Sequence, residues 1–204
     1  MFRWMALSIF AASLGISAYR RWQARKLGET IRRAEEPPAL IAARALVTLP
    51  LFGGVLAYLA NPRWMSWSSL PLPEWMQWSG VMLGLLVVPG VYWVLTTLGA
   101  NVSETVLTKS THQLVTTGPY QWVRHPLYAI GLLLFASIGF IAANWFILLC
   151  TVISAFAIRL AVIPREEREL IAKFGEGYRS LQRRTGALLP RLTRARPVQR
   201  SDVT

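Results

Sequence analysis

Long apolar runs that carry almost no charge constrain this chain more than any other feature. A helix that crosses a bilayer needs about 20 mostly apolar residues, because its backbone polar groups must be satisfied inside the hydrocarbon layer. A soluble domain can also be 53% hydrophobic, but it does not usually gather those residues into such runs. The sequence therefore predicts an all-α, polytopic transmembrane protein with about five spans. We expect the spans at residues 2–19, 39–60, 76–98, 126–143 and 145–163.

The first run has two interpretations. Small residues at positions 15–18 offer a weak cleavage site for a signal peptide. Arg20 and Arg21 follow at once, however, and a basic flank is typical of a span that is retained in the membrane. We therefore favour a first span over a signal peptide.

The last two runs are separated only by Asn144, so we expect a tight helical hairpin over residues 126–163. Each run is slightly short for a span, which leaves a re-entrant pair as the alternative. In the third run, Pro89 and Gly90 predict a kink, because proline removes one helical hydrogen bond.

Basic residues are distributed unequally along this chain, whose formal net charge is +12. The loop 20–36 and the C-terminal segment are strongly basic, whereas the tryptophan-rich connection after the second run contains only Arg63. The positive-inside rule then places these basic segments and residues 99–125 in the cytoplasm. We predict an integral protein of the bacterial inner membrane whose active site faces the cytoplasm. No nucleic-acid partner is expected, because the charge does not line a soluble face.

Three parts are predicted along the chain. Residues 1–98 hold three N-terminal spans, residues 99–190 form a catalytic core around the hairpin 126–163, and residues 191–204 form a basic tail. Basic tails of this kind are attracted to anionic lipid headgroups, so membrane lipids are expected partners.

Unusual polar motifs gather on the predicted cytoplasmic side. Before the hairpin the chain reads His-Gln-Leu-Val-Thr-Thr-Gly-Pro-Tyr at 112–120 and Arg-His-Pro-Leu-Tyr at 124–128. After the hairpin it reads Arg-Glu-Glu-Arg-Glu-Leu at 165–170 and Phe-Gly-Glu-Gly-Tyr at 174–178. Pro126 suits the first turn of a helix, and the free N–H groups of that turn favour an anion. The hairpin should bring both regions together, because its two ends lie on one side of the membrane.

This ordered set of motifs resembles the isoprenylcysteine carboxyl methyltransferase and phospholipid methyltransferase superfamily of integral membrane enzymes. The resemblance covers roughly residues 98–190, about half of the chain. It implies S-adenosylmethionine as the cofactor, and a cytoplasmic cofactor pocket formed by residues 99–125, the hairpin and the helix that follows it. It also implies methyl transfer to a membrane-embedded lipophilic acceptor, with an isoprenylcysteine-like carboxylate as one candidate.

Site residues carry over where this chain matches the family. The implied cofactor-binding residues are His112, Gln113, Leu114, Val115, Tyr120, His125, Pro126, Leu127, Tyr128 and Glu166. We predict Arg124 and Glu167 as the catalytic residues. Relatives commonly have a substrate-binding arginine where this chain has Val162. Arg159 lies about two helical turns before Glu166, on the same face. We predict that it binds the substrate instead; the alternative is that the substrate of this chain differs from that of the relatives.

The chemistry suits these residue types. Methyl transfer is a direct displacement that depends mostly on positioning and on the exclusion of water. Two histidines without suitable cysteine neighbours underfill a zinc site, so no metal is expected.

We interpret Phe174 and Tyr178 as anchors of an amphipathic helix. We expect the acceptor to enter from the bilayer through a gap bordered by Pro89–Gly90, Gly131 and Gly139.

Two other classes of protein remain open. A membrane reductase of the sterol reductase kind, using NADPH, shares an Arg-His-Pro-x-Tyr-like element. Its relatives, however, carry an aspartate and a cysteine before a Lys-Tyr-Gly-x-x-Trp pattern, whereas this chain has Lys173-Phe174-Gly175 and no cysteine there. A non-catalytic membrane protein linked to nitrogen-oxide metabolism also keeps part of the pattern.

Overall fold

The structure is a computed structural model that describes residues 1–27, 38–99 and 114–191. Its helices, in chain order, are α1 (Phe2–Leu27), α2 (Pro38–Ala60), η2 (Pro62–Ser68), α3 (Glu74–Leu98), η4 (Gly118–Gln121), α4 (Pro126–Ile141), α5 (Trp145–Ala157), the π-helix η5 (Ile158–Val162), α6 (Ile163–Phe174) and α7 (Glu176–Arg184). The predicted all-α class is confirmed, and each of the five apolar runs is helical.

Within the described residues, three helices are long and apolar enough to cross a membrane: Phe2–Lys26, Glu74–Leu98 and the continuous helix Trp145–Phe174. Two further apolar helices, Ala45–Ala60 and Pro126–Ile141, are shorter. The chain is therefore a polytopic membrane protein. The third of these long helices extends well beyond the predicted end at residue 163, since α5, η5 and α6 follow one another without a break.

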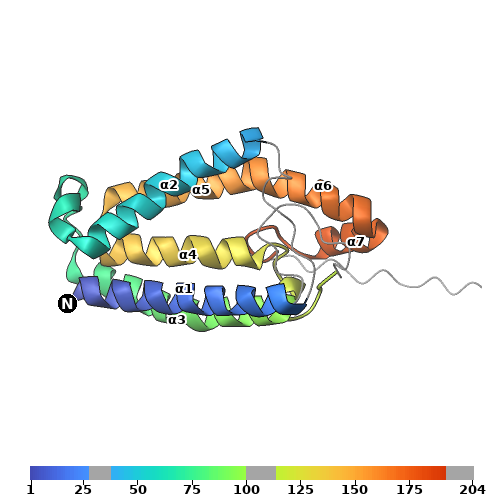
Figure 1. The fold of residues 1–204 in the computed structure, drawn as a ribbon, viewed down its shortest axis with the longest axis horizontal. Coiled ribbons are helices and arrows are strands. Elements are labelled where there is room, and N and C mark those ends of the chain that lie inside the picture. Colours follow the sequence, from blue (N-terminus) through green and yellow to red (C-terminus); the bar gives the residue numbers. More distant parts are fainter. Residues whose placement is uncertain (28–37, 100–113, 192–204) are drawn as a thin grey trace, which may run out of the picture.

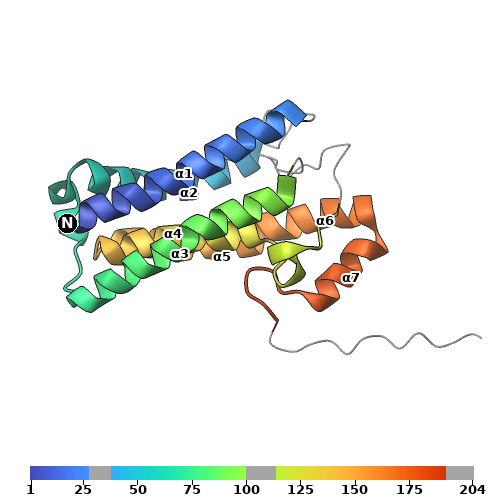
Figure 2. The ribbon, with the colours of Figure 1, turned by 90° about the horizontal axis from the view of Figure 1, so that it is seen from below.

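The helices form an elongated bundle with α4 at its centre (Figures 1 and 2). Helices α1 and α3 lie on one side of α4, and α2 lies with α5 on the other. The N-terminus and η2 lie at one end of the bundle, while η4, α6 and α7 gather at the opposite end (Figure 1). All the described motif residues thus lie at one end of the membrane bundle.

Small residues let α3 and α4 approach closely. A Cβ atom at Gly80 would lie 2.8 Å from Cβ of Phe140 and 2.9 Å from the backbone nitrogen of Ile141. The Ser137 hydroxyl, fully buried, donates to the Gly80 carbonyl over 2.8 Å. Close backbone contact of this kind is how helices gain packing energy in a membrane, where the hydrophobic effect does not drive their association.

Close packing contradicts the expected lipid-side gap at two of its three glycines. At Gly90 a Cβ atom would lie 2.7 Å from Cδ1 of Ile130, so α3 and α4 are closed together at the predicted opening. Gly139 packs just as closely against Leu148 of α5, at 2.6 Å. Of the three glycines proposed to border the gap, only Gly131 has open space beside it.

The predicted tight hairpin is present between α4 and α5. Asn144 caps α5 by accepting a hydrogen bond from the backbone N–H of Ile147 over 3.1 Å. Its amide donates to the Ser68 hydroxyl over 2.7 Å and to the Met65 carbonyl over 3.3 Å. One buried asparagine therefore joins the hairpin tip to η2 at the end of the bundle remote from the motifs.

Candidate active site

The site lies where the N-terminus of α4 meets α6, the charged end of the continuous helix Trp145–Phe174. Pro126 occupies the first turn of α4, as predicted, and places Arg124 and His125 in the preceding turn. The helix that includes α5 continues through η5 into α6, which carries Glu166 and Glu167. Residues about forty positions apart in the sequence thus come into contact.

Arg124 and Glu167 form a largely buried ion pair. Nε of Arg124 lies 2.8 Å from Oε1 of Glu167, and the two side chains are 9% and 17% exposed. Nη1 of Arg124 also donates to the carbonyls of Gln182, over 3.3 Å, and Thr185. A guanidinium held by three oxygens has little rotational freedom, because its planar fork of donors is rigid.

His125 lies between the two glutamates. Its Nε2 is 3.3 Å from Oε1 of Glu167, and its Nδ1 is 3.6 Å from Oε2 of Glu166. Its ring, whose side chain is 4% exposed, stacks on Tyr128 with centroids 5.8 Å apart. The structure therefore brings the predicted residues Arg124, His125, Tyr128, Glu166 and Glu167 into one polar cluster.

Two buried tyrosines complete this cluster. Burial, and then the charge of Glu166, raises the pKa of Tyr120 well above its usual range. Burial, and then the charge of Glu167, does the same to the pKa of Tyr178. Both phenols consequently stay protonated at neutral pH and can act as hydrogen-bond donors. Tyr178, which the sequence suggested was only an amphipathic anchor, is 2% exposed and lies beside the site.

A short segment after α7 clasps the Arg124–His125 turn, and the sequence did not predict it. Val123 and Gly186 form a parallel β-bridge. The backbone N–H groups of Arg124 and His125 donate to the carbonyls of Gly186 and Ala187 over 2.9 and 3.0 Å. We call residues 185–187 the C-terminal clasp. A Cβ atom at Gly186 would overlap the Leu189 carbonyl oxygen, so only glycine fits there.

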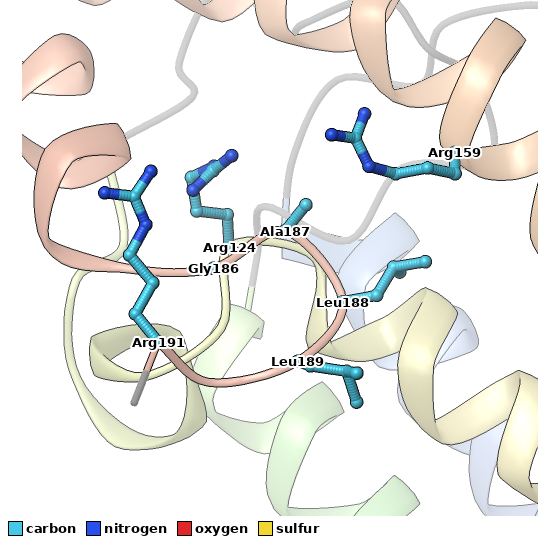
Figure 3. A pocket seen from close by; sticks show the side chains of 7 residues that line it. All are labelled: Arg124, Arg159, Gly186, Ala187, Leu188, Leu189 and Arg191. Carbon is cyan, nitrogen blue, oxygen red and sulfur yellow. The ribbon is translucent and has the colours of Figure 1, made fainter. Parts of the chain in front are cut away.

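Beside the clasp is a cavity of about 430 Å³ (Figure 3). It is lined by Arg124, Arg159, Gly186, Ala187, Leu188, Leu189 and Arg191. The guanidinium of Arg159 lies across the cavity from that of Arg124 (Figure 3), and it makes no hydrogen bond or ion pair with the described part of the chain. The cavity thus combines guanidinium groups with leucine side chains.

Arg159 reaches this cavity from the π-helix η5. A π-helix has more residues per turn than an α-helix, so the regular spacing that predicted Arg159 and Glu166 on one face does not hold here. Glu166 faces His125 and is not among the residues that line the cavity. Val162, at the position of the arginine found in relatives, is buried against Tyr128 and Ile158.

The other predicted site residues are placed as follows. Leu114 packs on the apolar cluster of α6 and α7 beside Tyr178, and Leu127 packs against the main core of the bundle. Val115 is partly buried in the segment before η4. His112 and Gln113 lie outside the described residues, so their predicted contact with the cofactor has no structural counterpart here.

Comparison with known proteins agrees with the motifs. Residues 81–172 match the model of the isoprenylcysteine carboxyl methyltransferase (ICMT) family. The fold is similar to that of the eukaryotic intramembrane Ras methyltransferase ICMT, with a TM-score of 0.53 and 22% identity. That similarity covers 91% of this chain and 67% of the solved one.

Three bacterial proteins are also similar in sequence. The uncharacterized protein YpbQ of Bacillus subtilis is 28% identical over 134 residues, which are 64% of this chain and 73% of YpbQ. The cobalt-zinc-cadmium resistance protein CzcN of Cupriavidus metallidurans is 39% identical over 88 residues. The nickel-cobalt-cadmium resistance protein NccN of Alcaligenes xylosoxydans xylosoxydans is 36% identical over 86 residues. The last two matches each cover 42% of this chain but only 39% of the relative.

The family match contains both halves of the polar cluster, Arg124–Tyr128 and Glu166–Glu167, and the fold match extends over nearly all of the bundle. The resemblance predicted from the motifs is confirmed: residues 81–172 match the isoprenylcysteine carboxyl methyltransferase family, and the fold is similar to that of a solved member.

Proposed function

We propose that the protein transfers a methyl group from S-adenosylmethionine to a lipophilic acceptor that it takes from the membrane. The observation that carries this proposal is the meeting of Arg124 and His125 with Glu166 and Glu167 in a buried cluster at one end of an apolar bundle. A reaction that depends on positioning and water exclusion needs such a preorganised, shielded site.

The side chains of the cluster fit the cofactor in chemical type. Glu166 supplies a carboxylate for the amino or ribose hydroxyl groups, while Tyr120 and Tyr178 supply protonated hydroxyls. The His125–Tyr128 stack offers aromatic surface. When bound, S-adenosylmethionine would supply an electrophilic methyl group on a sulfonium centre. We assign cofactor binding to these residues together with His112, Gln113, Leu114, Val115, Pro126 and Leu127.

Arg124 and Glu167 are assigned to the reacting centre. Their ion pair is held from several sides, so Arg124 keeps one orientation at the wall of the cavity. In that orientation it can bind and orient an acidic group of the acceptor.

Arg159 is assigned to the acceptor. It lies in η5, within the continuous helix Trp145–Phe174. Its side chain is solvent-exposed in the cavity and is not paired with another described residue. An ionisable side chain at membrane depth is energetically costly, and such side chains commonly mark functional sites. An acidic group of the acceptor would neutralise it, while Leu188 and Leu189 would contact the apolar part.

The cytoplasmic orientation is also part of the proposal. The C-terminal end of α1, with Arg20, Arg21, Arg25 and Lys26, lies at the same end of the bundle as the site (Figure 1). The opposite end has Arg3 and Arg63. The positive-inside rule then supports a site that faces the cytoplasm of a bacterial inner membrane.

The names of two relatives refer to metal resistance. Within the described residues there is no group of three or more His, Cys, Asp or Glu side chains that could hold a metal ion. We therefore propose no metal site for this chain.

Calorimetry on the detergent-purified protein tests the cofactor. We expect binding of S-adenosylmethionine and of its demethylated product, and no binding of NADPH. A folded protein that binds neither methyl donor nor product would contradict the methyltransferase proposal, and binding of NADPH instead would support the reductase.

Transfer of tritiated methyl groups tests the acceptor. Three probes would be compared: a prenylated cysteine, a long-chain fatty acid and phosphatidylethanolamine. Label on either acid supports the role of Arg159, and label only on the amine contradicts it. Arg159→Gln should raise KM for the acid about tenfold, because one charge-assisted hydrogen bond to the acid is lost. The affinity for S-adenosylmethionine should not change. Arg168→Gln, on the same helix but outside the cavity, is the matched control.

A further inference from the structure

The segment after residue 172 lies outside the part of the chain that matches the family, yet it makes several contacts in the site. Gln182, near the end of α7, donates from Nε2 to Oε2 of Glu167 over 2.9 Å. The backbone carbonyl of the same residue accepts from Nη1 of Arg124 over 3.3 Å. One residue of α7 therefore contacts both members of the buried ion pair.

The two oxygens of Glu167 are held from different directions. Oε1 faces Nε of Arg124, at 2.8 Å, and Nε2 of His125, at 3.3 Å. Oε2 accepts from Gln182. The last torsion of a glutamate side chain is broad and roughly two-fold, so contacts to one oxygen alone leave the carboxylate plane poorly defined. A donor on the second oxygen defines that plane.

The backbone of Gln182 is itself held firmly. The Thr185 side chain, 1% exposed, donates from its hydroxyl to the Leu181 carbonyl over 2.7 Å and so closes the last turn of α7. The C-terminal clasp follows directly and is bonded to the Arg124–His125 turn. Gln182 therefore lies between two points of attachment, which limits its movement relative to Glu167.

We propose that Gln182 is a positioning residue: it sets the plane of the Glu167 carboxylate, and through that carboxylate it orients Arg124 at the wall of the cavity and His125 between the two glutamates. The catalytic part of this inference rests on the proposed methyltransferase function, whereas the geometric part does not. Gln182 need not contact either substrate.

The test compares Gln182→Met with Gln77→Met. Methionine is similar in length and volume to glutamine but cannot donate a hydrogen bond. Gln77 is a matched control, because its amide donates to the Ile141 carbonyl over 3.1 Å at the opposite end of the bundle. Gln182→Asn, which keeps an amide but is one methylene shorter, is a milder second variant that retains the polar character of α7.

The first readout does not require turnover. The chain has two histidines, so the ring nitrogens of His125 can be assigned in ¹⁵N NMR spectra by comparison with His112→Gln. Because His125 and Gln182 contact the same carboxylate, both Gln182 variants should shift the His125 signals, and Gln77→Met should leave them unchanged. Unchanged His125 signals in both Gln182 variants would overturn the proposal, whatever the enzyme assays show.

The second readout is kinetic. We expect Gln182→Met to lower kcat about tenfold to a hundredfold, as small misplacements of catalytic groups do. KM for S-adenosylmethionine should rise by a clearly smaller factor, because His125 is also assigned to the cofactor. Gln77→Met should retain full kcat. A loss of cofactor binding in proportion to kcat would show a merely structural role and would overturn the inference. If both Gln182 variants shift the His125 signals as expected but the wild-type protein methylates no probe, the proposed function fails and the positioning role stands.

Discussion

At the scale of single residues, the polar cluster shows what a short motif can and cannot predict. Arg124, His125, Glu166 and Glu167 were all named from the sequence, by the motifs and the family resemblance, and the structure brings the four residues together. Their pairwise contacts were not predicted. A pair such as Arg124–Glu167 depends on the relative rotation of two helices, which the sequence does not reveal. Gln182 escaped notice for the same reason: an isolated glutamine on an amphipathic helix looks like any solvated residue.

Glu167→Gln is the sharpest test at this scale. The variant keeps the shape of the side chain but leaves the largely buried Arg124 without its counter-charge. We expect the free energy of unfolding to fall by about 1–3 kcal/mol, and methyl transfer to be nearly abolished. Thermal unfolding in detergent and the tritium assay would measure the two effects.

The control for that variant is Glu176→Gln. Glu176 also contacts arginines, Arg179 and Arg183, but it is exposed on α7. Exposed ion pairs contribute little to stability. We expect no measurable change in either assay, and equal losses from both glutamates would refute the special role of Glu167.

At the scale of elements, apolar runs and Pro126 predicted the helices well, because both act through local sequence. The helix α1 continues beyond the predicted end at residue 19, as basic residues are compatible with a helix though not with the bilayer interior. The π-helix at 158–162 was missed, since one additional residue per turn leaves no mark on composition. The C-terminal clasp was missed because a single β-bridge has no periodicity.

Gly186→Ala tests the C-terminal clasp. The new methyl group would overlap the Leu189 carbonyl oxygen, so residues 186–189 must move away from the Arg124–His125 turn. We expect methyl transfer to fall by about tenfold to a hundredfold, because the reacting groups lose their alignment. Gly15→Ala, on α1 where nothing lies within 4 Å of the added atom, should retain wild-type activity.

At the scale of the whole molecule, the two ends of the bundle differ in composition. One end has the motifs, the basic end of α1 and the clasp, and the other has the exposed tryptophans Trp64, Trp67 and Trp75 of η2 and the start of α3. The three-part division at residues 98 and 190 remains a prediction, although the buried apolar core includes residues from both sides of the first boundary.

Cysteine labelling tests the orientation. With Cys150 replaced, a cysteine at position 110 should react only with a reagent supplied from the cytoplasmic side. A cysteine introduced at the exposed Ser66 of η2 should react only from outside. The reverse pattern would show that the positive-inside rule had been applied to the wrong segments.

The unbroken helix Trp145–Phe174 has a mechanical consequence. Its first half is apolar and embedded, and its last turns carry Glu166 and Glu167, so a change in its tilt must displace both carboxylates relative to Arg124 and His125. Transmembrane helices adjust their tilt to the thickness of the surrounding lipid at a cost of fractions of a kcal/mol per Å. We expect turnover in vesicles to pass through an optimum as the acyl chains are lengthened, with cofactor affinity following the same curve. The thickness of the lipid layer would then control the geometry of the site, in addition to the layer being the source of the acceptor.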